Sequence, residues 1–172
     1  MSLLTPKGLG TRPTADRIKE NMFNIIAPNV RYARFLDLYC GSGAIGIEAL
    51  SRGAAEAVFV DVSKAAAHIT QINLARTGYT EGTEVLRMCA FEAISQLKRE
   101  GREFDIIFLD PPYGEGLLSR TIDALGNSGL LSAKGILIAE CAVAEPQNST
   151  NFFGLYDMRT YGNTRLEFYT GI

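Results

Sequence analysis

The segment DLYCGSGAIG has the composition of a nucleotide-binding loop between a strand and a helix. Gly41, Gly43 and Gly46 have the G-x-G-x-x-G spacing that brings a backbone turn close to a ligand. Asp61 follows Gly41 by 20 residues, where a carboxylate can accept hydrogen bonds from both hydroxyls of a ribose. NAD, FAD and S-adenosylmethionine all contain that ribose. The alternative is that the glycines only form a tight turn and allow close helix packing.

Asp37 favours S-adenosylmethionine over a dinucleotide. It lies near the end of the first predicted strand, shortly before the glycine loop. A negative charge there would oppose a pyrophosphate but would suit the ammonium group of a methionine moiety. The remaining chain also lacks a second nicotinamide-binding half. A nicotinamide-dependent oxidoreductase, or a nucleotide-binding module without catalysis, is the alternative from another functional class.

The segment FLDPPY ends an apolar run with an acid, two prolines and an aromatic ring. Because prolines have no N–H, the stretch presents acceptors, chiefly the Asp110 carboxylate and the Pro111 carbonyl. Two acceptors on the exocyclic amine of a purine favour a pyramidal, more nucleophilic nitrogen in the transition state. Tyr113 offers a flat face for the base, and the reaction would be in-line displacement at a sulfonium methyl. The alternative is that Pro111 and Pro112 merely end the strand.

The N-terminal segment is basic although the whole protein carries a net charge of −2. Residues 1–34 have a net charge of +4, against −6 for the remainder. A basic face confined to one segment can bind a polyanion, and Arg12, Arg17 and Lys19 are the candidates for phosphate contacts. A solvated helix face would show the same charge pattern.

Cysteine and histidine usage limits the other kinds of site. Cys40, Cys89 and Cys141 are too widely spaced for a C-x-x-C clip, and three cysteines do not form a paired disulfide framework. His68 is the single histidine, which excludes a multi-histidine metal site or a histidine triad. No apolar stretch approaches the ~18 residues of a membrane span, and no signal-peptide pattern is present. We therefore expect a cytoplasmic protein without a metal.

Short β-rich runs alternate with helical segments from residue 35 onward, which is typical of an α/β fold with a mostly parallel sheet. The predicted strands are 35–39, 57–61, 84–88, 104–109 and 135–141, with a terminal hairpin of 156–161 and 165–170. The predicted helices after the glycine loop are 44–52, a segment capped by Ser63 and ended by Gly78, 91–100 and 117–126.

An additional helix precedes the first strand. We expect Thr14 to cap it, Ile18 and Met22 to face inward, and the helix to end before Pro28. No linker or repeat interrupts the chain, so we expect one domain over residues 1–172. It would consist of a basic lead-in and helix up to residue 34 and a Rossmann-like core over 35–172.

Together these motifs resemble the class I methyltransferases with a D/N-P-P-Y/F motif. The likeness is strongest to the RsmD-type family, which methylates N2 of a guanine in bacterial small-subunit (16S) ribosomal RNA. The stretches that carry it are TRPT from Thr11 with ENMF after it, DLYCGSGAIGIEALSRGA from Asp37, FLDPPY, and YGNTRLEFY. The R-P-T lead-in distinguishes this family from other amino methyltransferases. The resemblance implies a three-layer αβα sandwich whose seven-stranded sheet has an antiparallel last strand.

The resemblance also implies a cofactor, a substrate and roles for residues. The cofactor would be S-adenosylmethionine, with S-adenosylhomocysteine as product, and the substrate would be ribosomal RNA or a small-subunit assembly particle. Residues 110–113 would hold the target base. The residues expected around the cofactor are Thr14, Asp37, Tyr39, Gly41, Ser42, Gly43, Asp61, Val62, Cys89 and Ala90. An adenine-N6 methyltransferase acting on DNA or RNA is the alternative within the same reaction class.

Two features depart from the family pattern. The family usually has Asp or Asn after the third strand, whereas this chain reads MCAF from Met88. A thiol is a poor acceptor, so we expect backbone groups and apolar packing to hold the adenine. The family also begins with a basic β-hairpin, whereas this sequence starts close to what would be its second strand. We expect either a longer natural chain or a weaker grip on RNA.

Overall fold

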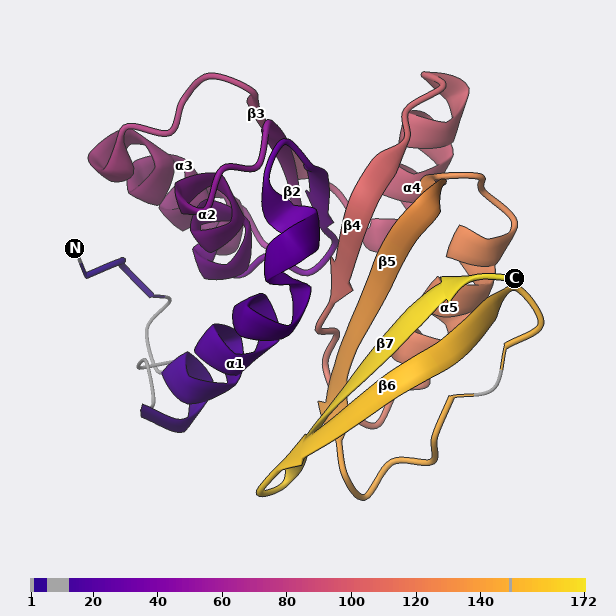
Figure 1. Cartoon of the computed structure of the whole chain (residues 1–172). Helices are drawn as coiled ribbons and strands as arrows, with labels where there is room; N and C mark the ends of the chain where they lie inside the picture. Colours follow the sequence, from indigo (N-terminus) through magenta and orange to yellow (C-terminus); the bar gives the residue numbers. More distant parts are fainter. Residues whose placement is uncertain (1, 6–12, 149) are drawn as a thin grey trace.

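A single mixed sheet organises the protein (Figure 1). The computed structural model describes residues 2–5, 13–148 and 150–172, without the side chains of residues 13 and 14. In the described residues the strand order is β3-β2-β1-β4-β5-β7-β6, and β7 runs antiparallel to both its neighbours. The strands are β1 (Arg34–Asp37), β2 (Glu56–Asp61), β3 (Thr83–Arg87), β4 (Phe104–Leu109), β5 (Leu131–Ala142), β6 (Phe153–Tyr161) and β7 (Thr164–Gly171). This confirms the predicted fold class.

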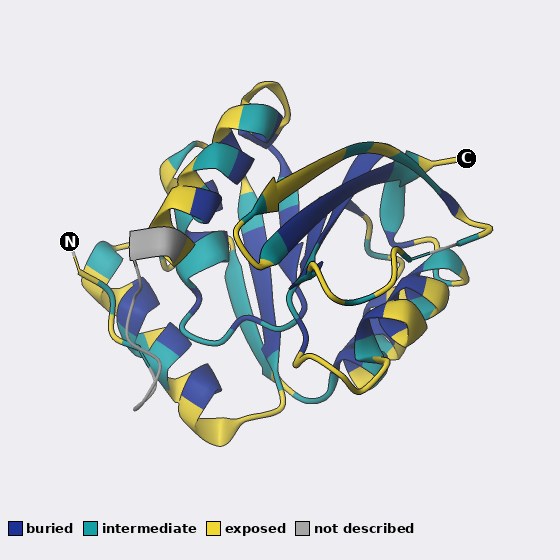
Figure 2. Ribbon diagram, turned by 90° about the horizontal axis from the view of Figure 1, so that it is seen from below, coloured by how far each residue is buried: buried dark blue, intermediate teal, exposed yellow. Residues whose placement is uncertain are grey.

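Helices cover both faces of the sheet, with α1, α2 and α3 on one side and α4 and α5 on the other (Figure 1). Their bounds are α1 (Pro13–Val30), α2 (Ala44–Ser51), α3 (Lys64–Thr77), α4 (Ala90–Arg99) and α5 (Leu117–Gly126). Neighbouring strand residues point to opposite faces, so Phe35 joins the core under α1 while Leu36 joins the core under α4. Figure 2 shows the buried strands between helices whose outer faces are exposed. Because both faces are covered, the central strands are continuously apolar.

The first helix differs from its prediction at both ends. It begins at Pro13, so Thr14 is not its cap; proline suits the first helical position because its φ is preset and no bonded N–H is lost. It ends at Val30 rather than before Pro28. Pro28 is exposed, and so is Asn24, whose carbonyl would have accepted the missing N–H and can bind water instead. The inward positions of Ile18 and Met22 are confirmed.

The third helix, α3, has the predicted caps, and polar residues lie on its buried face. Ser63 Oγ accepts a hydrogen bond from the Ala66 N–H at 3.2 Å, and Gly78 follows the helix with a φ of 79°. Thr70 and Asn73 are fully buried, whereas the apolar Ile69 is only half-buried. The polar residues take the inner face because they hydrogen-bond to the glycine loop.

Gly46 of α2 is required by close packing on β2. A Cβ added there would lie 2.3 Å from Cε1 of Phe59, whose ring is fully buried. Gly46→Ala should therefore lower the free energy of unfolding by about 1–2 kcal/mol, because overpacking exceeds the gain in helix propensity. Urea denaturation measures this. Gly154→Ala, where a Cβ meets nothing within 4 Å, is the control. Equal stability of Gly46→Ala and wild type would contradict the packing argument.

Candidate active site

The glycine loop joins β1 to α2 and is held by Asp61 at the end of β2. The N–H groups of Gly41 and Ser63 each donate to one carboxylate oxygen of Asp61, both at 2.9 Å. The Gly43 N–H donates to the Cys40 carbonyl at 2.8 Å. Two loop amides are therefore used within the protein, whereas a pyrophosphate-binding loop directs its N–H groups at the ligand.

Two buried polar side chains of α3 hold the other side of this loop. Thr70 Oγ1 donates to the Gly41 carbonyl and Asn73 Nδ2 donates to the Ser42 carbonyl, each at 2.9 Å. Gly43 has a φ of 81°, and a Cβ there would lie 2.8 Å from Thr70 Cγ2, so this position accommodates only glycine. Neither α3 residue is predicted from the sequence. The sequence pattern that could have identified them is a pair of polar residues spaced i, i+3 within an apolar stripe of the helix.

Asp37, the last residue of β1, is a buried carboxylate without a partner among the described residues, and it is not in the lining of the cavities described below. Its side chain is 1% exposed, and neither oxygen accepts a hydrogen bond from the described residues. Burial raises the pKa of Asp37 to about 7, and the nearby backbone of Gly46 and Tyr39 only partly opposes that rise. A buried group of this kind is suited to a cationic ligand, which would restore its charged form.

A cavity of about 730 Å³ opens at the carboxyl ends of the parallel strands, where open α/β sheets bind ligands. Its lining brings together most of the predicted site residues: Tyr39, Gly41, Asp61, Val62, Cys89, Ala90, Asp110, Pro111, Pro112 and Tyr113. Phe91 adds an aromatic ring beside Cys89, on the wall where the family has an acid or amide. The Tyr39 hydroxyl donates to Thr121 Oγ1 at 2.7 Å, since the Thr121 proton is given to the Leu117 carbonyl.

The DPPY segment forms the boundary of this cavity. Asp110 comes directly after β4, and burial raises its pKa well above the ordinary range, with the charges of Glu140 and Asp37 adding to the rise. Tyr113 is 53% exposed, so its side chain is accessible to a base. Partial burial, together with the charge of Asp110, raises the pKa of Tyr113 to about 12, so its hydroxyl stays protonated.

A second cavity of about 520 Å³ lies on the other side of DPPY, between α5 and residues 143–148, which form the first part of the β5–β6 loop. Glu145 Oε1 accepts a hydrogen bond from the Gly114 N–H at 3.0 Å, which joins this loop to the segment after DPPY. Three backbone carbonyls of the loop accept hydrogen bonds from Arg165 of β7. The walls of the second cavity are therefore fixed from two sides.

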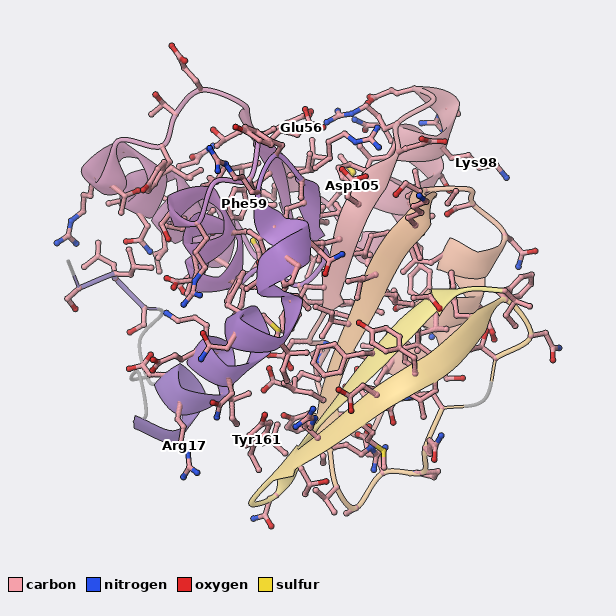
Figure 3. The ribbon with its side chains drawn as sticks, viewed as in Figure 1. Arg17, Glu56, Phe59, Lys98, Asp105 and Tyr161 are labelled. Carbon is pink, nitrogen blue, oxygen red and sulfur yellow. The ribbon has the colours of Figure 1, made fainter. Side chains whose placement is uncertain are left out.

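A third cavity of about 420 Å³ lies toward α1. Its lining includes Ser42, a predicted cofactor residue, and Lys19, a predicted phosphate contact. Arg17 is exposed and points away from α1 at the end of the molecule opposite Glu56 and Asp105 (Figure 3). Since Glu56 begins β2, Arg17 lies toward the carboxyl ends of the parallel strands, as the site does.

Not all of the basic lead-in faces the site. Arg12 and the side chain of Thr14 lie outside the described residues. Arg34 forms an ion pair with Asp105, with Nη2 3.0 Å from Oδ1 and Nε 3.1 Å from Oδ2. The Asp105 carboxylate raises the pKa of Arg34, and the guanidinium in turn lowers the pKa of Asp105. This pair joins β1 to β4 at the amino ends of the strands, so part of the N-terminal positive charge has a structural role.

Glu140 is a site residue that the sequence-based prediction lacks. It lines the second and third cavities beside the DPPY segment. The signal for it is the apolar run GILIA followed by an acid, which repeats the pattern of IIFL followed by Asp110. No group of His, Cys, Asp and Glu placed to hold a metal ion is found within the described ranges. None of the described helices is long and apolar enough to cross a bilayer.

Comparisons with known proteins agree with this geometry. A family model described as Conserved hypothetical protein 95 matches residues 1–170. Ribosomal RNA small subunit methyltransferase D of Escherichia coli is 38% identical over 141 residues, which are 82% of this chain and 69% of that protein. The yhhF protein of Escherichia coli has a TM-score of 0.84 and 34% identity, covering 98% of this chain and 90% of that chain.

A more distant solved structure, a SAM-dependent methyltransferase from Agrobacterium tumefaciens, has a TM-score of 0.65 and 25% identity, covering 80% of this chain and 47% of that chain. The order of the motifs, the strand order and these similarities agree. The predicted family is thus confirmed: the chain belongs to the family of ribosomal RNA small subunit methyltransferase D.

Proposed function

We propose that this protein transfers the methyl group of S-adenosylmethionine to the exocyclic N2 amino group of a guanine in small-subunit (16S) ribosomal RNA. The observation that carries the proposal is the position of Asp110 and Pro111, whose acceptors border the cavity that contains Asp61. Membership of the methyltransferase D family supports the RNA substrate. From such a substrate we infer that the protein acts in the cytoplasm.

The residues present fit S-adenosylmethionine. Asp37, buried and without a hydrogen-bond partner among the described residues, suits the ammonium group of the methionine moiety. Each oxygen of Asp61 already accepts one backbone N–H and retains a lone pair for a ribose hydroxyl. Cys89, Ala90 and Phe91 provide apolar surface for the adenine. When bound, the cofactor supplies an electrophilic methyl group on a sulfonium centre.

The DPPY segment orients and activates the amine. The Asp110 carboxylate and the Pro111 carbonyl accept the two amino protons, which disfavours delocalisation of the nitrogen lone pair into the ring. Tyr113 stacks against the base. Formation of the N–C bond would be accompanied by cleavage of the sulfonium C–S bond, which leaves the thioether of S-adenosylhomocysteine. The alkylated nitrogen is then acidic, and its proton would pass to Asp110 or to water. A guanine N2 inside a duplex cannot reach this pocket, so the target is flipped out or lies in a loop.

Methyl transfer to undermodified small-subunit RNA and particles tests the proposal. Tritiated S-adenosylmethionine reports incorporation, and mass spectrometry of the digested RNA identifies the nucleoside. N2-methylguanosine is the expected product. N6-methyladenosine would instead support the adenine-specific alternative.

Calorimetry separates the methyltransferase from a nicotinamide-dependent enzyme. S-adenosylhomocysteine should bind and NADH should not, because the Gly41 and Gly43 amides are occupied and the buried Asp37 opposes a pyrophosphate. Tight NADH binding without a response to S-adenosylhomocysteine would refute the cofactor assignment.

Arg17 and Lys19 are proposed to contact RNA phosphates. The double variant Arg17→Glu/Lys19→Glu should weaken RNA binding and reduce the slope of log K against log salt by about 1 to 2, as expected for the loss of two phosphate contacts. The charge-matched control is Lys98→Glu/Lys134→Glu. Both control residues are exposed, and Figure 3 shows Lys98 at the end of the molecule opposite Arg17. An equal change of slope in the two double variants would place the RNA elsewhere.

A further inference from the structure

Glu140 is a second acid beside Asp110. The two residues follow paired positions of adjacent parallel strands, since Leu109 of β4 is in register with Ala139 of β5. Neighbouring strands lie about 4.8 Å apart, so the two residues lie side by side toward the carboxyl ends of the parallel strands. Both line the third cavity, and Glu140 also lines the second, together with Pro111 and Tyr113.

The carboxylate of Glu140 is available to a ligand. No hydrogen bond or ion pair joins it to any side chain or backbone group in the described part of the chain. The other acid lining the second cavity, Glu145, already accepts the Gly114 N–H. Burial raises the pKa of Glu140, and its negative charge contributes to the raised pKa of Asp110. Two adjacent, half-buried acids are unfavourable without donors between them.

The Watson–Crick edge of guanine supplies such a pair of donors, because its N1–H lies beside its N2 amino group. Adenine places a bare N1 lone pair beside its N6 amino group, which a second carboxylate would repel. Enzymes that flip a base out of a duplex recognise it by hydrogen bonds to this edge. We propose that Glu140 accepts the N1–H of the target guanine while Asp110 accepts from N2, which makes Glu140 the residue that selects guanine over adenine. This inference rests on the proposed function and adds a specificity residue to it.

The test uses 2-aminopurine, which keeps the N2 amine but has an unprotonated N1. The base is placed at the nucleotide that the wild-type enzyme methylates, in RNA assembled into the small-subunit substrate. Glu140→Gln retains the size of the side chain and provides an amide N–H that can donate to N1. The measured quantity is the ratio of kcat/KM on guanine to kcat/KM on 2-aminopurine. We expect this ratio to be about tenfold or more lower in Glu140→Gln than in the wild type.

Two variants make the result specific. The methionine in Glu140→Met neither donates a hydrogen bond nor accepts a strong one. This variant should therefore lose activity on guanine without gaining activity on 2-aminopurine. Glu145→Gln removes a carboxylate from the same cavity. It should leave the ratio of kcat/KM values at the wild-type value, even if its absolute rate of methyl transfer changes. Calorimetry with S-adenosylhomocysteine and a thermal melt establish that each variant is folded and binds the product.

The failures of the two proposals are distinguishable. If the wild-type enzyme forms N2-methylguanosine but Glu140→Gln keeps the wild-type ratio, the role of Glu140 is wrong and the proposed function stands. If the wild-type enzyme forms N6-methyladenosine, the proposed function fails and the guanine contact fails with it.

Discussion

Replacement of Asp110 by alanine should reduce methyl transfer about 100- to 1000-fold, the effect of removing one pre-organised hydrogen-bonding group at a reacting centre. The carboxylate is held at the end of β4 beside the cavity that contains Asp61, so the reacting amine loses one of its two acceptors. Binding of S-adenosylhomocysteine should change little, because Asp37 and Asp61 are intact. Single-turnover methyl transfer and calorimetry measure the two effects separately.

A second substitution at this position, Asp110→Asn, should show that the carboxylate lowers the stability of the fold. The folded state raises the pKa of Asp110, so between its unfolded and folded pKa values the folded protein binds more protons. Stability therefore falls as pH rises through that interval. Asp110→Asn removes a carboxyl group whose charged form is disfavoured by burial, so it should raise the melting temperature at neutral pH. It should also retain more activity than Asp110→Ala through its amide oxygen.

Asp123→Ala is the matched control, because Asp123 is exposed on α5 and outside the lining of all three cavities. It should transfer methyl groups at the wild-type rate. Equal incorporation by wild type and Asp110→Ala would contradict the proposed role of the DPPY segment. A melting temperature of Asp110→Asn below that of wild type would contradict the buried-charge argument.

Arg165→Ala should lower the free energy of unfolding by about 3–5 kcal/mol, as expected when one partner of a buried ion pair is removed. Arg165 Nε lies 2.9 Å from Glu167 Oε1, and the Glu167 side chain is fully buried. The guanidinium also donates to the carbonyls of Val143, Glu145 and Pro146 at 3.0–3.2 Å. Its loss leaves a buried carboxylate and three carbonyls without these donors.

The consequences of this loss should extend to the site. The β5–β6 loop forms a wall of the second cavity, so Arg165→Ala should also raise KM for RNA. Glu167 has two further partners, since Asn148 Nδ2 donates to it at 3.0 Å and the Tyr169 hydroxyl also donates to it. These neutral donors cannot replace the positive charge of the guanidinium.

Arg159→Ala provides the control within the same hairpin. Arg159 forms an ion pair with Asp157 at 3.2 Å, but its side chain is 53% exposed, so its loss should have little effect on stability. Urea denaturation of both variants makes the comparison. Similar losses of stability in Arg165→Ala and Arg159→Ala would show that burial does not strengthen the Arg165 pair.

Part of the fold could be read from local patterns. The strands were predictable because a strand buried on both faces is a short apolar run, as in IIFL and VFV. Their bounds were less predictable. β5 begins at Leu131 instead of Gly135, because the pairing of β5 with β4 continues past a change of register between Phe104 and Ile106. β1 ends at Asp37, so Leu38 and Tyr39 belong to the turn.

The sequence by itself determined the family, the order of the motifs and the residues nearest to the chemistry. Gly41, Asp61 and Asp110 are tied to strand ends by local rules of turn and strand formation, and parallel strands end at one edge. Only the tertiary structure decided that Asp37 is buried without a partner among the described residues and that Thr70 and Asn73 hold the loop. It also decided that Arg34 pairs with Asp105 and that Glu140 lies beside Asp110. These facts depend on strand order and burial, which bring together residues about 30 to 70 positions apart, and no local pattern contains them.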